Sequence, residues 1–173
     1  MCIRDSFTTV PPLPGAASSP TPTDAATDIA LDATLDWTAG SDATSHDVYF
    51  GTNPTPGAGE LQGNQAGTTF DPGALSASTT YYWRIDEVNA GGTTTGVVWS
   101  FTTVPPLPGT ASSPAPADAA TDIALDATLS WSAGSDATSH DVYFGTNPAP
   151  GAGELQGNQA CLLYTSPSPR DRG

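Results

Sequence analysis

The chain is poor in the residue types that mark several functional classes. Its 173 residues include no lysine, four arginines and two cysteines, and no long apolar run. Recognition of phosphates requires clustered Lys and Arg, so their scarcity disfavours nucleic acid and anionic membranes as partners. A membrane helix needs about 20 consecutive apolar residues, so no membrane insertion is expected. No stretch has the apolar period of an amphipathic helix, which disfavours a helical fold.

Repetition is the main positive feature of the sequence. Residues 7–66 recur as residues 101–160, at an offset of 94 and with six differences in sixty positions. A period of this length is a whole domain, because solenoid repeats span about 20–50 residues. The sequence therefore predicts a tandem array of one small domain, whose partners are the adjacent repeats of the same polypeptide.

The two ends of the sequence are related at the level of DNA. Residues Met1–Asp5 can be encoded by ATG TGT ATA AGA GAC, and the reverse complement, extended by one base, encodes Cys161–Thr165. This inverted match resembles translated sequencing-adapter sequence, so residues 1–6 and 161–173 are interpreted as adapter scars and set aside. Both cysteines lie in these scars, and no disulfide or thiolate metal site is expected.

The remaining residues form an acidic chain with almost no positive charge. Residues 7–160 contain sixteen acidic residues and one arginine, Arg84, which gives a net charge near −15. Such a charge keeps a protein soluble, and an acidic, Thr-rich composition without cysteine is typical of secreted bacterial proteins. We therefore expect a secreted or cell-surface (extracellular) location. Aromatic residues at every second position, as at Tyr81 and Trp83, disfavour disorder.

Proline-rich segments divide the chain into domains. Residues 7–15 are predicted to be the end of a preceding domain plus a Pro-rich linker, and residues 104–109 a second linker, since proline stiffens an extended chain. Residues 16–103 then form one complete domain. Residues 110–160 form a truncated second copy, which lacks a counterpart of residues 67–103.

Alternating apolar residues predict an all-β, antiparallel sandwich. Strands are expected at 34–38, 46–50, 81–86 and 97–102, with short edge pieces at 60–63 and 68–70 and a hairpin turn at Asn89–Gly92. On this alternation Val97 points inward, whereas Tyr82, Arg84 and Asp86 point outward. Ten side chains are expected to meet between two sheets about 10 Å apart: Leu35, Trp37, Val48, Phe50, Leu75, Tyr81, Trp83, Ile85, Trp99 and Phe101.

The segment from Leu75 to Gly92 resembles a known family. Its pattern Leu75-x-x-x-Thr79-x-Tyr81-x-Trp83-Arg84-Ile85, followed by Asn89 and Gly92, is similar to the E–F corner and F strand of fibronectin type III domains. Trp37 stands where that family has a B-strand tryptophan. The resemblance implies an immunoglobulin-like sandwich of seven strands, a corner tyrosine Tyr81 bonded to main chain near Leu75, and a spacer or binding role without catalysis. Glu87 departs from the pattern, because the family usually has a small residue there.

The truncated copy keeps part of a core without the strands that would cover it. Leu129, Trp131, Val142 and Phe144 repeat the apolar positions of the first copy. Half a sandwich leaves an apolar face and a sheet edge open. Residues 110–160 alone are therefore predicted to be molten, domain-swapped or aggregation-prone.

No motif in the sequence supports catalysis. His46 and His140 are one position in two repeats, and His46 precedes Asp47, a pairing that could orient an imidazole. A catalytic dyad also needs a nucleophile and a shaped pocket, for which no motif is present. A structural or surface role is therefore favoured for this histidine, and no catalytic residue, cofactor or enzyme activity is predicted.

Five aspartates are candidate calcium ligands: Asp24, Asp28, Asp32, Asp36 and Asp42. Calcium takes six to eight oxygens that converge on one loop, whereas these acids lie four to six positions apart across strands and loops. Solvated acidic surface is the favoured interpretation, and no metal site is predicted. A weak inter-domain calcium site near the Pro-rich linker is the alternative.

The outward residues of two strands suggest one ion pair and one binding surface. Arg84 is expected to pair across strands with Asp47, which as an exposed pair is worth about 0–1 kcal/mol. Tyr49 and Tyr82 either stabilise the sheet as a cross-strand pair or form a flat platform on which sugars stack. The sequence thus favours a non-catalytic extracellular spacer or adhesion module. The alternative is a carbohydrate-binding accessory module of a secreted enzyme, with polysaccharide or other surface proteins as partners.

Overall fold

The computed structural model describes residues 9–160, which form two compact units that divide between Pro106 and Leu107. The predictions for the adapter scars, and for Phe7 and Thr8 of the preceding domain, lie outside the described residues. Each unit is considered by itself below.

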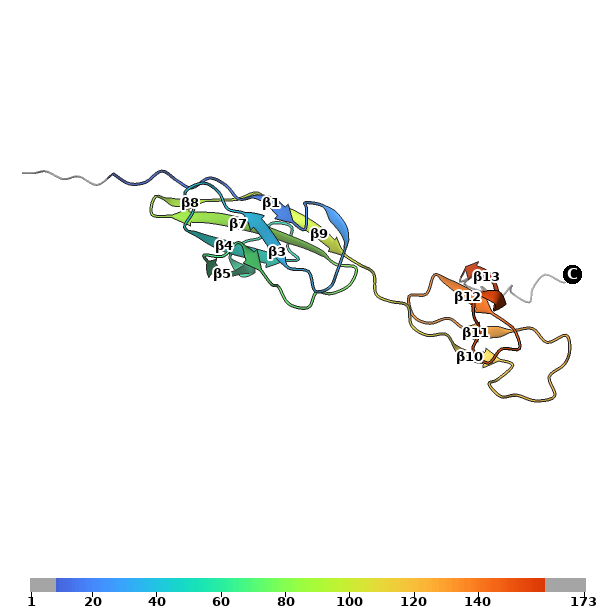
Figure 1. Cartoon of the computed structure of the whole chain (residues 1–173). Helices are drawn as coiled ribbons and strands as arrows, with labels where there is room; N and C mark the ends of the chain where they lie inside the picture. The colour runs from blue at the N-terminus through green and yellow to red at the C-terminus, as the bar shows by residue number, and fades with distance from the viewer. Residues whose placement is uncertain (1–8, 161–173) are drawn as a thin grey trace, which may run out of the picture. The chain divides into compact units, whose positions relative to one another are not determined.

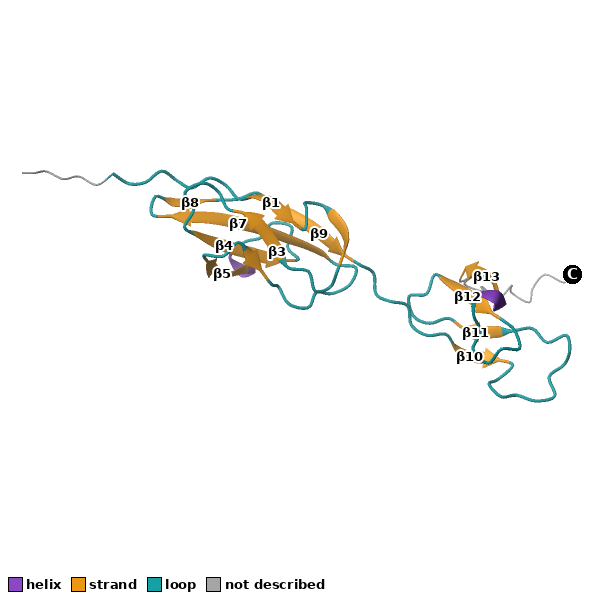
Figure 2. Ribbon diagram, in the orientation of Figure 1, coloured by secondary structure: helices purple, strands orange, loops and turns teal. Residues whose placement is uncertain are grey.

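The first unit is an antiparallel β-sandwich, as the alternation predicted (Figures 1 and 2). One sheet has the order β1-β3-β6, and the other has the order β2-β9-β7-β4-β5, with β8 paired to β7. All pairs are antiparallel except β2 with β9. The strands are β1 (Ser18–Thr21), β2 (Ala26–Ile29), β3 (Leu35–Thr38), β4 (Ser45–Gly51), β5 (Leu61–Gln65), β6 (Thr69–Phe70), β7 (Thr80–Asn89), β8 (Gly92–Thr94) and β9 (Trp99–Thr103).

The core of this sandwich is the predicted one, with one exception. Nine of the ten expected side chains are buried, and Ala17 joins them. Phe50 is only half-buried, but its ring stacks on Tyr81 with centroids 5.1 Å apart. Each fully buried large side chain contributes about 1.5–3 kcal/mol. This core therefore stabilises a domain that has no disulfide among its described residues.

The corner tyrosine is confirmed. The hydroxyl of Tyr81 accepts a hydrogen bond of 3.0 Å from the backbone N–H of Ser76, next to Leu75. The contact ties the loop before β7 to the strand itself, while the ring remains in the core.

Replacing Tyr81 by phenylalanine is expected to lower the free energy of unfolding by about 1 kcal/mol, because one hydrogen bond is lost while the ring is kept. Urea denaturation of the full chain, followed by tryptophan fluorescence, measures the change. A loss above about 3 kcal/mol would show that the hydroxyl does more than tie this corner.

The segment before β9 differs from the prediction. Val97 was expected to point inward in a strand, but it precedes β9 and is 59% exposed. The chain leaves the sheet here because the N–H of Gly96 bonds the carboxylate of Asp86 at 3.0 Å. A Cβ at Gly96 would lie 2.1 Å from the carbonyl oxygen of Ile85, so only glycine allows this approach. Strands β1, β2 and β8 were not predicted, because their residues show no alternation of apolar and polar side chains.

The second unit repeats half of the first. Its strands are β10 (Ser112–Ala115), β11 (Ser130–Ser132), β12 (Ser139–Tyr143) and β13 (Leu155–Ala160), which pair as β10-β11 and β12-β13. The tetrapeptide that forms β2 in the first unit recurs unchanged at residues 120–123 but forms no strand there. Its partner β9 has no counterpart among the described residues of this unit, and an edge strand without a partner does not form.

Burial differs sharply between identical residues of the two units. Leu35 is 0% exposed, but its counterpart Leu129 is 47% exposed, and Phe144 reaches 61%. None of residues 107–160 is buried. The prediction of an all-β, antiparallel sandwich is therefore confirmed for the first unit, and the described residues of the second unit form strands equivalent to β1, β3, β4 and β5. The predicted behaviour of the half-domain as molten, swapped or aggregation-prone stays a prediction.

Candidate functional site

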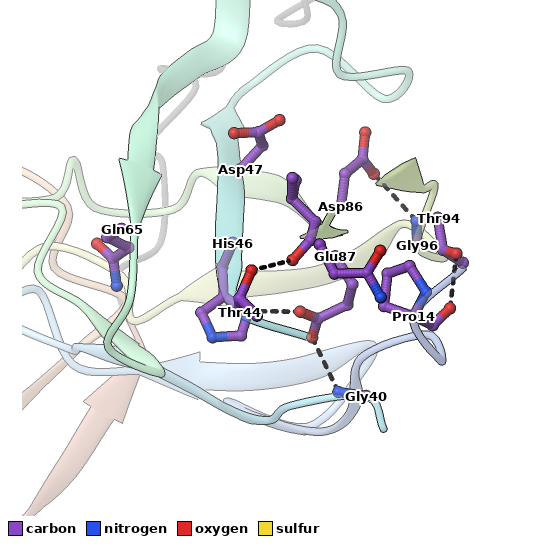
Figure 3. Close-up of polar contacts among 12 residues, drawn as sticks. Pro14, Gly40, Thr44, His46, Asp47, Gln65, Asp86, Glu87, Thr94 and Gly96 are labelled. Carbon is purple, nitrogen blue, oxygen red and sulfur yellow. Dashed lines mark hydrogen bonds and ion pairs between the residues drawn. The ribbon is translucent and has the colours of Figure 1, made fainter. Parts of the chain in front are cut away.

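A buried polar cluster joins β4 and β7 near one end of the first sandwich (Figure 3). One carboxylate oxygen of Glu87 lies 2.5 Å from Nδ1 of His46, and the other accepts the backbone N–H of Gly40 at 3.0 Å. Glu87 is 0% exposed and His46 is 3% exposed. The histidine ring also packs edge-on against Trp37, with centroids 5.5 Å apart. The cluster thus extends the core with hydrogen-bonded polar groups.

Burial decides what this cluster can do chemically. A general acid or base must come within hydrogen-bond distance of a substrate, and neither His46 nor Glu87 reaches the surface. Asp47, the neighbour considered as an orienting group, instead accepts a hydrogen bond of 2.7 Å from Asn64. The favoured structural interpretation of His46 therefore agrees with its surroundings, whereas the suggested pairing with Asp47 was wrong.

Sequence reasoning noted Glu87 only as a departure from the family pattern and missed its partner. The signal was present, because Glu87 continues the inward alternation of Tyr81, Trp83 and Ile85, and His46 shares the phase of Val48. The two residues are directly opposite in the ladder of β4 and β7. Two polar residues at inward positions of neighbouring strands indicate a buried pair, since a lone buried charge is costly.

The predicted ion pair between Arg84 and Asp47 was also wrong. Arg84 instead forks onto Asp86, two residues along the same strand, with contacts of 2.8 Å and 3.1 Å. Its guanidinium also donates to the carbonyl of Pro56 and lies 4.3 Å from the centre of the Tyr49 ring. Asp86, expected outward, is 5% exposed because the chain at Gly96 covers it. In the ladder Arg84 faces Tyr49, which explains the stacking.

The tyrosine platform is not formed as an open surface. The guanidinium of Arg84 stacks on the ring of Tyr49, and Tyr82 lies opposite Gly51 rather than Tyr49 in the ladder. Both tyrosines are half-buried. A sugar that stacked on Tyr49 would compete with Arg84 for the ring.

The candidate calcium ligands do not converge. Within residues 9–160, no three His, Cys, Asp or Glu side chains are grouped so that they could hold a metal ion. Asp24 instead accepts the backbone N–H of Ser100 at 2.9 Å, and Asp28 accepts the hydroxyl of Thr27. Over the same residues, no helix is long and apolar enough to cross a membrane.

The Pro-rich segment before the first sandwich is bound to it. Gly15 donates to the carbonyl of Ser41 at 2.8 Å, while Asn89 and Thr94 donate to the carbonyls of Pro12 and Pro14. The contact at Gly15 recurs in the second unit, where Gly109 donates to Ser135 at 2.8 Å. The segment therefore packs on the sandwich that follows it. The prolines predicted a stiff segment, but the sequence did not predict that this segment packs on the sandwich.

The strand order β1-β3-β6 against β9-β7-β4-β5 defines an immunoglobulin-like β-sandwich module. Within that class, the hydrogen bond from the backbone of Ser76 to the hydroxyl of Tyr81 is the corner contact that the resemblance to fibronectin type III domains implies. Comparison with family models and with curated proteins gives no match. Among solved structures, one described as "Crystal Structure of FN3tt" is 21% identical, with a TM-score of 0.39, and the similarity covers 51% of this chain and 96% of that chain. A second, "Structure of FN3tt mut", is 16% identical over the same shares, with a TM-score of 0.36.

Proposed function

We propose that the chain is part of a non-catalytic spacer in a secreted or cell-surface protein built from tandem repeats. The supporting observation is the way in which the chain enters and leaves the first sandwich. The docked segment contacts Asn89, the last residue of β7, whereas Val104 bonds to Ser78, just before β7 begins. Entry and exit thus lie at the two ends of a ten-residue strand, roughly 30 Å apart. A module whose chain enters at one end and leaves at the other adds its full length to a tandem array.

The charge of the surface fits the same role. Residues 7–160 carry sixteen acids and one arginine, and that arginine is engaged with Asp86. Like-charged modules repel one another and remain soluble. The polar groups of the buried cluster bond to one another away from the surface, which supports a structural role for them.

Gly40→Ala is expected to release the docked segment, because the new Cβ would lie 1.9 Å from the carbonyl oxygen of Gly15. NMR relaxation of the full chain would then show the order parameters of Leu13 and Gly15 falling from about 0.85 to below about 0.6. Gly59→Ala is the control, since its Cβ meets nothing within 4 Å. Unchanged order parameters of Leu13 and Gly15 in Gly40→Ala would contradict the rigid docking of the Pro-rich segment on the sandwich.

Retention on polysaccharides distinguishes the spacer from a carbohydrate-binding accessory module. We expect the full chain to pass unretarded through columns of insoluble cellulose, chitin and xylan. Retention that disappears on replacing Tyr49 and Tyr82 by alanine would contradict the spacer and support the accessory module.

A further inference from the structure

The loop of residues 39–44, which joins β3 to β4, is held by residues at the end of β7. The backbone N–H of Gly40 donates to the carboxylate of Glu87 at 3.0 Å. The N–H of Thr44 donates to the carbonyl of Val88 at 2.8 Å. The loop is therefore attached near both of its ends to two consecutive residues of one strand.

The Pro-rich segment rests on this loop. Gly15 donates to the carbonyl of Ser41 at 2.8 Å. The backbones approach so closely that a Cβ at Gly40 would lie 1.9 Å from the carbonyl oxygen of Gly15. The bond from segment to loop recurs between Gly109 and Ser135. Segment and loop thus form one joint, and the position of the segment depends on what holds the loop.

The bond from Gly40 to Glu87 differs in charge and burial from the other side-chain contact that reaches this loop. The side-chain amide of Asn89 donates to the carbonyl of Asp42 at 3.1 Å, which joins two neutral groups at the surface. Glu87 is 0% exposed, and its acceptor is a carboxylate. A hydrogen bond to an ionised group is about twice as strong as one between neutral groups, and a buried bond is strengthened further by the low local dielectric.

The carboxylate of Glu87 is itself fixed by the two strands that flank the loop. Its second oxygen lies 2.5 Å from Nδ1 of His46, the second residue of β4. The ring of His46 packs edge-on against Trp37 of β3, with centroids 5.5 Å apart. A path of direct contacts therefore runs from the core through His46 and Glu87 to Gly40 and the docked segment (Figure 3).

We propose that Glu87 is a positioning residue for the Pro-rich segment. Its buried carboxylate fixes the loop to β7, and the loop fixes the segment, so that segment and sandwich move as one body. This role depends on the proposed spacer function, in which a stiff entry segment keeps the array extended. Without the carboxylate, the bond from Gly15 to Ser41 remains, but segment and loop move together against the sandwich.

The experiment measures ¹⁵N relaxation of the full chain in the parent and in three variants. In Glu87→Ala, the order parameters of Gly15 and Gly40 are expected to fall together from about 0.85 to below about 0.6. Glu87→Gln keeps an acceptor for Gly40 and is expected to keep both residues ordered. Leu35→Ala is the control for lost stability, because it opens a cavity at the end of β3 away from the loop. It is expected to leave both order parameters unchanged.

Two results in the variants would overturn the proposal while leaving the docking of the segment intact. They are an ordered Gly15 in Glu87→Ala, and an equal loss of order in Leu35→Ala. Low order of Gly15 already in the parent would instead contradict the docking itself, and with it the stiff entry of the spacer. The failure of the proposed function and the failure of this role are thus distinguishable.

A measurement on the parent chain alone does not depend on the folding of any variant. The N–H of Gly40 is expected to exchange with solvent at least about a hundredfold more slowly than the same amide in an unfolded chain, because the buried carboxylate holds it. A smaller factor would show that the loop opens freely from Glu87, which would overturn the proposal.

Discussion

Leu35→Ala is expected to lower the free energy of unfolding of the first sandwich by about 2–5 kcal/mol, whereas Leu129→Ala is expected to leave it unchanged. Both substitutions remove the same side chain from equivalent positions of the two repeats. Leu35 is 0% exposed between the two sheets, and Leu129 is 47% exposed. The cost of Leu→Ala comes from lost burial and from the cavity left behind, and Leu35 has much more burial to lose than Leu129.

Urea denaturation of the full chain, followed by tryptophan fluorescence, measures both changes. The signal of the first sandwich comes from its three tryptophans, which neither substitution removes. A separate unfolding transition of the second unit that Leu129→Ala lowers by a similar amount would mean that this unit has a closed core, which would contradict the account. The free energy of unfolding of a small domain is about 5–15 kcal/mol, so the predicted loss is a large fraction of its stability.

Glu87→Ala is expected to destabilise the first sandwich by about 3 kcal/mol or more, chiefly through the loss of its polar contacts. The substitution leaves the ring of His46 and the N–H of Gly40 buried without their shared acceptor. Removing one partner of a buried polar pair costs more than the pair contributes, because the remaining group was desolvated for it. The resemblance to a family with a small residue at this position would instead predict a neutral change.

Thermal and urea unfolding of the full chain distinguish these outcomes. Glu87→Gln is the graded control, since it keeps an acceptor for Gly40, and we expect it to cost less than Glu87→Ala. Asp32→Ala is the surface control and should change neither transition, because this residue is exposed. Stability equal to the parent in Glu87→Ala would show that the cluster contributes nothing and that the family pattern is the better guide.

Most of the fold could be predicted from the alternation of apolar and polar residues, because successive side chains of a strand point to opposite faces of the sheet. It located β3, β4, β7 and nearly all of the core, and the corner motif located the bond of Tyr81. It did not locate β1, β2 or β8, since their residues do not alternate between apolar and polar.

The polar contacts were harder to predict than the core. Arg84 and Asp47 are near neighbours in the ladder, but Asp86 lies on the same face of the same strand and is covered at Gly96. A loop that covers a strand leaves no periodic pattern in the sequence, so alternation could not predict the partner of Arg84. The pairing of His46 with Glu87 could have been predicted, because both residues lie at inward positions of their strands.

Amide hydrogen exchange of the full chain in dilute solution tests the central claim, that one repeat is closed and its near-identical copy is open. NMR reads the two units separately, and the comparison is between β3 and β11 and between β4 and β12. The account predicts that β3 and β4 exchange only when the first sandwich unfolds, and that β11 and β12 exchange faster by on the order of a hundredfold or more. Equal protection of the matched strands would contradict it.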